Sequence, residues 1–350
     1  MEILEQLGDA NVIFIIGIVT GLAFGVFGQQ SRFCLRSATT EFWHASPGMK
    51  TAIWLLAFAV ALTMTQCLLQ LGQLDAGNIR QLSGTGSVSG AILGGLLFGC
   101  GMILARGCAS RLLILSATGN LRALMSGLLL TIVAQASLRG VLSPLREAFA
   151  GQWLIGGADR SLGSFLPVYS GIILGVVLLI IGFILARRSG LGNWRVACAC
   201  GVGLVIAFGW WATYWHSGWA FEASVPQSVS FTGPSADTLM ALINTPALPK
   251  SFGAGLVPGV FAGALVAAIL SREFKLASFD QQSGMLRYLV GAVFMGFGSM
   301  LAGGCAVGAG MTGGAVFATT AWLALFAMWL GAGVTDWWLT TIGKLTLAAR

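Results

Sequence analysis

Long apolar runs dominate this sequence and decide what it can fold into. Nine of them approach 20 residues, the length at which an α-helix spans about 30 Å of hydrocarbon. Hydrophobic residues make up 56% of the 350-residue chain and charged residues only 9%, whereas a soluble domain carries roughly 25% charged residues. The sequence therefore predicts an all-α integral membrane protein with a single transmembrane domain, residues 1–350. The nine predicted spans cover residues 11–28, 51–72, 88–105, 121–138, 167–186, 194–213, 253–271, 287–303 and 319–342.

Four further apolar segments are too short or too interrupted to cross a membrane. We expect half-membrane helices or re-entrant pieces there, because irregular backbone at membrane depth is tolerated only where protein buries it or water lines it. A cysteine lies within or directly before three of these segments. The four segments are residues 31–43, 109–118, 235–246 and 306–317.

The basic residues indicate an orientation in the membrane. With the N-terminus outside, the nine spans place 14 lysines and arginines on the inner side and 5 on the outer side. Cytoplasmic loops of membrane proteins carry the excess of positive charge, so this orientation is favoured and the C-terminus is predicted to be cytoplasmic. Topology and contact with anionic membrane lipid then explain the net charge of +7. No nucleic-acid partner is predicted.

An internal repeat is the most informative pattern in the chain. Residues 90–109 and 287–306 align without gaps at an offset of 197, and eight of the 20 aligned positions are identical. In the predicted threading the two copies cross the membrane in opposite directions. We therefore expect an inverted repeat, with residues 11–140 and 194–342 as its halves and 167–186 as the linking helix. Such repeats place the substrate site at their interface, near the midplane and at broken helices.

Both copies end at a Gly-Cys pair, Gly107-Cys108 and Gly304-Cys305. Glycine there would let the helix break and let backbones approach closely. The half-helix after each break would aim backbone N–H groups and a positive dipole end at a desolvated anion. A thiol is a weak donor and a soft, polarisable contact, which suits a sulfur-containing substrate that must also leave. These features predict a transporter for a small sulfur-containing anion.

Cys34 is the third candidate, because it follows a helix with Gly21, Gly25 and Gly28 on one face. Arg32 and Arg36 flank Cys34 at the predicted cytoplasmic end, where they either attract an anion or anchor the topology. The sequence contains neither a phosphate-binding loop nor a dinucleotide fingerprint, and Cys198-x-Cys200 lacks partners for a metal. No cofactor and no metal are therefore predicted. The other four cysteines, Cys67, Cys100, Cys198 and Cys200, are best interpreted as buried apolar residues.

Five motifs give the chain a resemblance to a known family. They are QQSRFCLRSA at 29–38, FGCGMILARGCAS at 98–110, SVSFTGPSADTL at 228–239, SREFK at 271–275 and GFGSMLAGGCAVGAGMTGG at 296–314. With these motifs the chain resembles the YeeE/YedE family of membrane proteins, of the thiosulfate-transporter type, over nearly its whole length. The resemblance implies nine spans plus half-helices in an hourglass-like inverted repeat, and thiosulfate uptake across the bacterial inner membrane.

The resemblance also implies which residues matter. The three central cysteines that pass thiosulfate along by thiol hydrogen bonds match Cys34, Cys108 and Cys305, and a small cytoplasmic sulfur-carrier protein is an implied partner. The sequence departs from the pattern at Arg106, where a small residue is common, and at Ser110-Arg111. These basic groups are expected to bear on substrate choice or gating. We therefore take Arg106 as a candidate substrate-binding residue beside Arg32, Gly107, Gly304 and the three cysteines.

Two other functions remain open at this point. A membrane thiol enzyme could accept a persulfide on Cys108 or Cys305, although no base lies near either cysteine in the sequence. A helical scaffold could recruit a soluble sulfur carrier without transporting anything. Formation and turnover of a covalent adduct would identify the enzyme, and cargo uptake by the protein alone would exclude the scaffold.

Overall fold

The computed structural model describes residues 8–220, 224–246, 249–277 and 284–348. Within these ranges each of the nine predicted spans corresponds to a long helix. Eight helices of the described residues are long and apolar enough to cross a membrane, and the helix at residues 319–348 is not among them. The long helices are α2 (Asp9–Ser31), α4 (Met49–Gln70), α6 (Val88–Leu104), α8 (Leu121–Arg139), α10 (Ser170–Arg188), α11 (Asn193–Ser217), α13 (Phe252–Leu270), α14 (Met285–Leu301) and α15 (Thr319–Ala348). The prediction of an all-α membrane protein is confirmed.

Short helices stand where the sequence predicts half-membrane pieces. They are α3 (Leu35–Trp43), α7 (Ala109–Ala117), α12 (Thr232–Asn244) and the π-helix η4 (Ala306–Gly313). The connections also contain small elements that the apolar pattern does not predict, since each is too short to have a hydrophobic period. These elements are η1 (Ala76–Asn78), α5 (Arg80–Ser83), β1 (Gly86–Ser87), α9 (Ser143–Ala150), β2 (Leu154–Ile155), η2 (Gly157–Arg160) and η3 (Leu162–Ser164), and β1 pairs antiparallel with β2.

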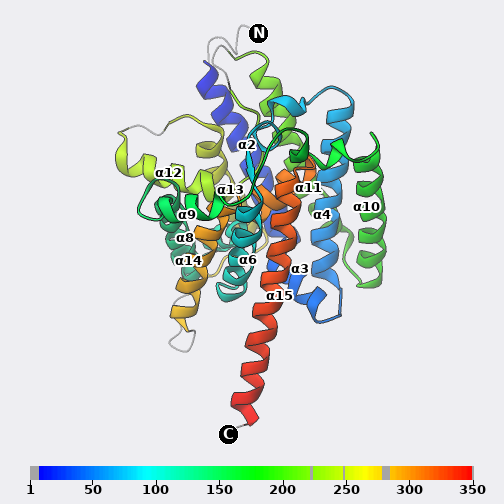
Figure 1. Cartoon of the computed structure of the whole chain (residues 1–350). Coiled ribbons are helices and arrows are strands. Elements are labelled where there is room, and N and C mark those ends of the chain that lie inside the picture. Colours follow the sequence, from blue (N-terminus) through cyan, green and yellow to red (C-terminus); the bar gives the residue numbers. More distant parts are fainter. Residues whose placement is uncertain (1–7, 221–223, 247–248, 278–283, 349–350) are drawn as a thin grey trace.

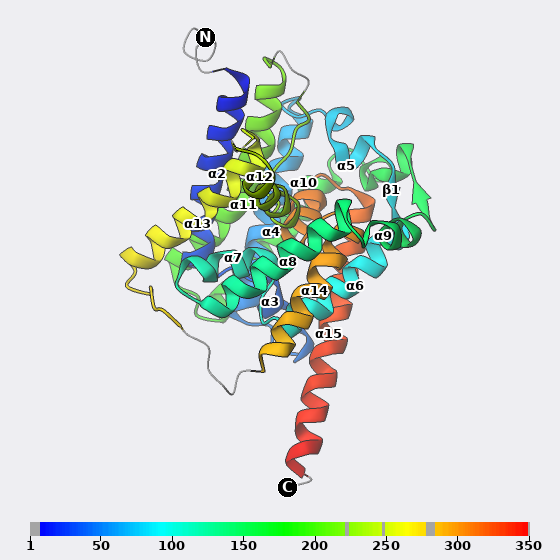
Figure 2. The same cartoon turned by 90° about the vertical axis from the view of Figure 1, so that its left-hand side faces the viewer.

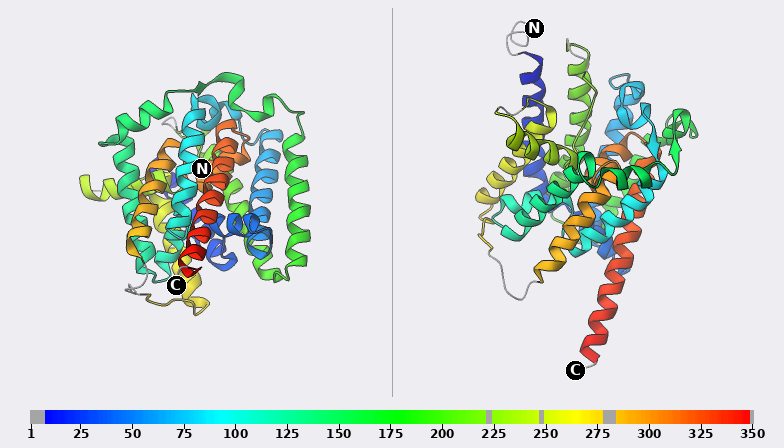
Figure 3. Two further views of the ribbon diagram at one scale, coloured as in Figure 1. Left: turned by 60° about the horizontal axis from the view of Figure 1, so that its bottom comes forward. Right: turned by 60° about the vertical axis from the view of Figure 1, so that its left-hand side comes forward.

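The helices form one bundle whose two ends carry the two ends of the chain (Figure 1). Helix α2 packs along α13, α6 lies between α14 and α15, and α11 contacts both α2 and α4. The short helices α3 and α7 pack against the long ones, and α12 lies at the side of the bundle against α8 and α13 (Figure 1, Figure 2). Helix α10 packs on α4 at the margin of the bundle, and α15 extends beyond the other helices (Figure 3).

Close backbone contact fixes the crossing of α6 with α14. A Cβ on Gly94 would lie 2.5 Å from the carbonyl O of Gly298, and one on Gly291 would lie 2.7 Å from the carbonyl O of Gly101. The offset of 197 residues converts the first pair into the second, so the two helices contact each other reciprocally. This is the contact pattern of a pseudo-two-fold axis. Small residues permit the approach, as is common between membrane helices.

Candidate functional site

Each candidate cysteine follows the same kind of helix break. Two residues before the cysteine, the backbone enters the left-handed region, at Arg32 (φ 56°), Arg106 (φ 57°) and Gly303 (φ 79°). The amide after each left-handed residue donates to the carbonyl five residues earlier in the preceding helix, at 3.1, 3.1 and 2.8 Å, which closes that helix. Cys34, Cys108 and Cys305 are then the N-cap residues of α3, α7 and η4.

Capping places all three thiols over the first turn of a half-helix. The Sγ of Cys305 accepts a hydrogen bond from the backbone N–H of Gly308, at 3.4 Å. The thiols of Cys34 and Cys108 lie close to the backbone N–H groups of Ser37 and Arg111, which are likewise three residues further on. Each thiol therefore lies where unsatisfied N–H donors and the positive end of a helix dipole meet.

The structure brings Cys34 and Cys108 together. The two thiols lie near each other, and the Sγ of Cys108 lies 3.3 Å from the hydroxyl of Ser110. Both cysteines are buried, with 7% and 0% of their surface exposed. Cys305 is also buried, and its Sγ contacts the backbone N–H of Gly308, whereas the two candidate thiols that lie near each other are those of Cys34 and Cys108. The repeat-related pair of the sequence is therefore not this pair.

A guanidinium lies beside the thiol pair. Arg111 on α7 is half-buried and interacts electrostatically with both Cys34 and Cys108. Its Nη1 donates a hydrogen bond of 3.4 Å to Oε1 of Gln29, and Nε2 of Gln29 donates one of 2.9 Å to Oε2 of Glu273. A polar chain therefore runs from the thiols to the loop after α13.

Glu273 ends this chain at the surface. The Nη2 of Arg32 donates to Oε1 of Glu273 at 2.8 Å, so the carboxylate accepts from an arginine and from Gln29 at once. The hydrogen bond from Arg32 is the main reason that the pKa of Glu273 lies below its ordinary value. We name the set Cys34, Cys108, Arg111, Gln29 and Glu273 the thiol–arginine site.

The sequence singled out Arg111 only as a departure that could bear on substrate choice or gating, and it gave no role to Gln29 or Glu273. Gln29 lies in the last turn of α2 only five residues before Cys34, and a buried glutamine in an apolar helix is a usable signal. Glu273 is distant in sequence, so only the packing of α2 along α13 brings it into contact.

The other predicted site residues are placed around the breaks. Arg106 is exposed and its Cζ lies 5.9 Å from the ring centre of Tyr288. Gly107 and Gly304 are buried, but neither is the left-handed residue of its turn. Gly304 has a steric role, because a Cβ there would lie 2.7 Å from the backbone N of Ala309. A Cβ added at Gly107 would meet no atom nearer than a side-chain carbon at 3.4 Å.

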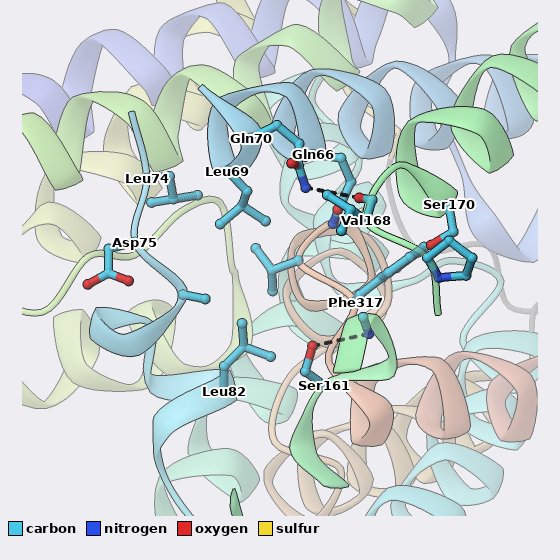
Figure 4. A pocket seen from close by; sticks show the side chains of 14 residues that line it. Gln66, Leu69, Gln70, Leu74, Asp75, Leu82, Ser161, Val168, Ser170 and Phe317 are labelled. Atoms are coloured by element: carbon cyan, nitrogen blue, oxygen red, sulfur yellow. Dashed lines mark hydrogen bonds between the residues drawn. The ribbon is translucent and has the colours of Figure 1, made fainter. Parts of the chain in front are cut away.

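A pocket of about 380 Å³ opens at the end of the bundle where α4 finishes. Val316 and Phe317, which follow η4, line it together with Gln66 and Gln70 of α4 (Figure 4). No lysine or arginine is among its described lining residues. Helices α2 and α4 run in opposite directions (Figure 1). The pocket at the end of α4 and the Arg32–Glu273 pair after the end of α2 therefore lie toward opposite ends of the bundle.

The groups that the structure brings together at this site are ones that bind an anion. Among the described residues, no three His, Cys, Asp or Glu side chains gather as a metal site would require. The site instead combines soft thiols, half-helix N-termini and one guanidinium inside a bundle of membrane-crossing helices. This architecture is that of a membrane transport protein.

The chain belongs to the sulphur transport family, whose family model matches residues 30–334. It is similar to the thiosulfate transporter TsuA of Escherichia coli (strain K12), at 26% identity over 348 residues, which cover 92% of this chain and 93% of that protein. It is also similar to the thiosulfate transporter TsuA of Spirochaeta thermophila (strain ATCC 700085 / DSM 6578 / Z-1203), at 26% identity over 337 residues, covering 92% and 97%. The family suggested by the sequence motifs is confirmed, and the family and both relatives are described as transporting sulfur compounds.

Proposed function

We propose that this protein takes up thiosulfate, or a closely related small sulfur-containing anion, across the bacterial inner membrane. The observation that carries the proposal is the thiol–arginine site, where Cys34 and Cys108 meet over two half-helix N-termini. The names of the two similar transporters support thiosulfate as the substrate.

An anion that crosses the membrane must lose its hydration shell. An anion at membrane depth must exchange its water for other donors, because an uncompensated charge in hydrocarbon costs several kcal/mol or more. Backbone N–H groups at helix N-termini supply donors without adding side-chain charge. A thiol holds an anion weakly, so the anion can move on to the next site.

We further propose that residues 11–140 and 194–342 are the halves of an inverted repeat, with the helix predicted at 167–186 between them. The reciprocal contacts of α6 with α14 support this, as do the matching breaks before Cys108 and Cys305. In this arrangement the N-terminus is outside and the C-terminus cytoplasmic. The hourglass shape follows, with half-helices meeting from the two sides.

The path then begins at the pocket lined by Phe317. It continues along η4 to Cys305, passes to Cys108 and Cys34, and leaves beside Arg32 and Arg106. Gly107 and Gly304 bring the backbone of each break close to the passing anion. The cytoplasmic sulfur carrier implied by the sequence resemblance would receive the anion or its sulfur on the inner side.

The test is uptake of radiolabelled thiosulfate into proteoliposomes that contain only this protein. The proposal expects uptake by the wild type, little uptake of sulfate, and a large loss in both Cys108→Ala and Cys305→Ala. Cys198→Ala is the matched control, because Cys198 is equally buried but outside the path. Absence of uptake by folded wild type would contradict the proposal and leave the enzyme or the scaffold, and a stable covalent adduct on Cys108 would favour the enzyme.

A further inference from the structure

Together with Arg32, which pairs with Glu273, the thiol–arginine site has more positive than negative charge. Glu273 is the carboxylate of the network, and both Arg32 and Arg111 contribute positive charge around it. Arg32 forms an ion pair with Glu273, but the three ion pairs of the described residues do not include Arg111. Among the described residues, the charge of Arg111 is therefore not balanced by an ion pair with a carboxylate.

Arg111 also has donors to spare. A guanidinium carries five N–H groups in a planar fork that matches an oxyanion. Within the part of the chain that the structure describes, the side chain of Arg111 makes a single long hydrogen bond, at 3.4 Å to the amide oxygen of Gln29. Because Arg111 lies beside Cys34 and Cys108, its remaining N–H donors are available to a ligand that binds next to the two thiols.

We propose that Arg111 is the specificity-determining residue of the path, binding the oxyanion end of the substrate while Cys34 and Cys108 contact its soft sulfur end. This inference rests on the proposed function and defines its substrate class as an anion with one terminal sulfur and one oxygen-bearing end. Sulfate has no soft end for the thiols, and an anion without oxygens makes no fork-like contact with the guanidinium. Selectivity then requires both halves of the site.

Gln29 is the positioning residue for Arg111. Its Oε1 accepts a hydrogen bond from Arg111 and its Nε2 donates one to Glu273. The neutral amide therefore lies between the guanidinium and the carboxylate and keeps them from pairing directly. A carboxylate in direct contact with Arg111 would compete with the substrate. The amide holds the guanidinium in place and leaves its charge available.

The closing experiment measures concentration-dependent thiosulfate uptake in proteoliposomes for wild type, Arg111→Gln and Arg111→Lys. We expect Arg111→Gln to raise the KM by about tenfold or more, the loss that accompanies removal of one charge-assisted hydrogen bond. Arg111→Lys keeps the charge without the planar fork and should lie between wild type and Arg111→Gln. Arg188→Gln removes an exposed charge from the end of α10 and is the matched control with an unchanged KM.

A second variant separates binding from folding. Gln29→Glu combined with Glu273→Gln keeps the total charge and the hydrogen bond between these two positions, but brings the carboxylate into contact with Arg111. We expect a folded protein with an increased KM, whereas a purely structural role of Arg111 predicts uptake as good as or better than wild type. The single variant Glu273→Gln controls for loss of the Arg32 ion pair.

The outcomes are distinguishable. Wild-type uptake with an unchanged KM in folded Arg111→Gln, or in the exchanged pair, would overturn the role of Arg111 and leave the proposed function intact. Wild type without any thiosulfate uptake would overturn both. Elution as a single species and the melting temperature in detergent establish that each variant is folded.

Discussion

Replacing Gly94 or Gly291 with alanine should drive α6 and α14 apart. A Cβ at Gly94 would lie 2.5 Å from the carbonyl O of Gly298, and one at Gly291 would lie 2.5 Å from the backbone N of Ala105. Ordinary contact begins near 3.4 Å, so each substitution requires a local separation of about 0.9 Å. Both contacts are with backbone, which cannot rotate away as a side chain can.

The expected cost is about 1–3 kcal/mol for overpacking at such a contact. Helices α6 and α14 each end only four residues before Cys108 and Cys305, so their separation also displaces both thiols. A shift of this size in a preorganised site reduces activity by roughly tenfold or more. We therefore expect a lower melting temperature and reduced thiosulfate uptake in both variants, by similar amounts, because Gly94 and Gly291 are equivalent in the repeat.

Gly127→Ala on α8 is the matched control, since no atom lies within 4 Å of the added Cβ. It should melt at or above the wild-type temperature and transport normally. Wild-type melting and uptake in Gly94→Ala would refute the close crossing. Damage in Gly94→Ala without damage in Gly291→Ala would refute the equivalence of the two helices.

Two further predictions follow from the breaks and from their surface network. Gly304→Ala should lower uptake and stability because its Cβ would lie 2.7 Å from the backbone N of Ala309, whereas Gly107→Ala should be tolerated; uptake and melting of the two variants side by side check this, and equal damage would contradict it. The lowered pKa of Glu273 stabilises the fold above the ordinary carboxyl pKa of about 4.3, and this contribution is lost as pH falls through the folded pKa. Arg32→Gln should therefore melt below wild type at pH 6, with the difference closing in acid, and a pH-independent difference would argue against the ion pair.

Much of the fold follows from local sequence. The positions of the long helices follow from run length, and those of the four short helices follow from runs that are too short or interrupted. The breaks before Cys108 and Cys305 follow from the repeated Gly-Cys ending. These signals are readable because each depends on neighbouring residues.

The pairing of thiols does not follow from local sequence. The repeat relates Cys108 to Cys305, but the structure places Cys108 against Cys34, because contact depends on how α3 and α7 are packed by α4, α8 and α13. The residue that adopts the left-handed conformation at the break also differs between the two copies of the repeat. The left-handed position is a glycine in one copy and Arg106 in the other, so the break does not need glycine in both.

The charge network escaped prediction for a similar reason. Gln29 and Glu273 are 244 residues apart and meet only because α2 packs along α13. A basic residue after Cys108 was visible in the sequence, but its meaning depends on which acid, amide or thiol faces it. Burial of Arg111 beside two thiols gives it a role that its position in the chain does not.

The central claim is that a sulfur-containing anion binds where Cys34, Cys108 and Arg111 converge. The most direct measurement is anomalous diffraction from crystals of the protein soaked with selenosulfate, in which selenium replaces the terminal sulfur of thiosulfate. The account predicts an anomalous selenium peak next to the two thiols, with oxygen density toward Arg111, and its loss in Cys108→Ala. A selenium peak confined to the pocket beside Phe317, or one next to the thiols that persists in Cys108→Ala, would contradict the account.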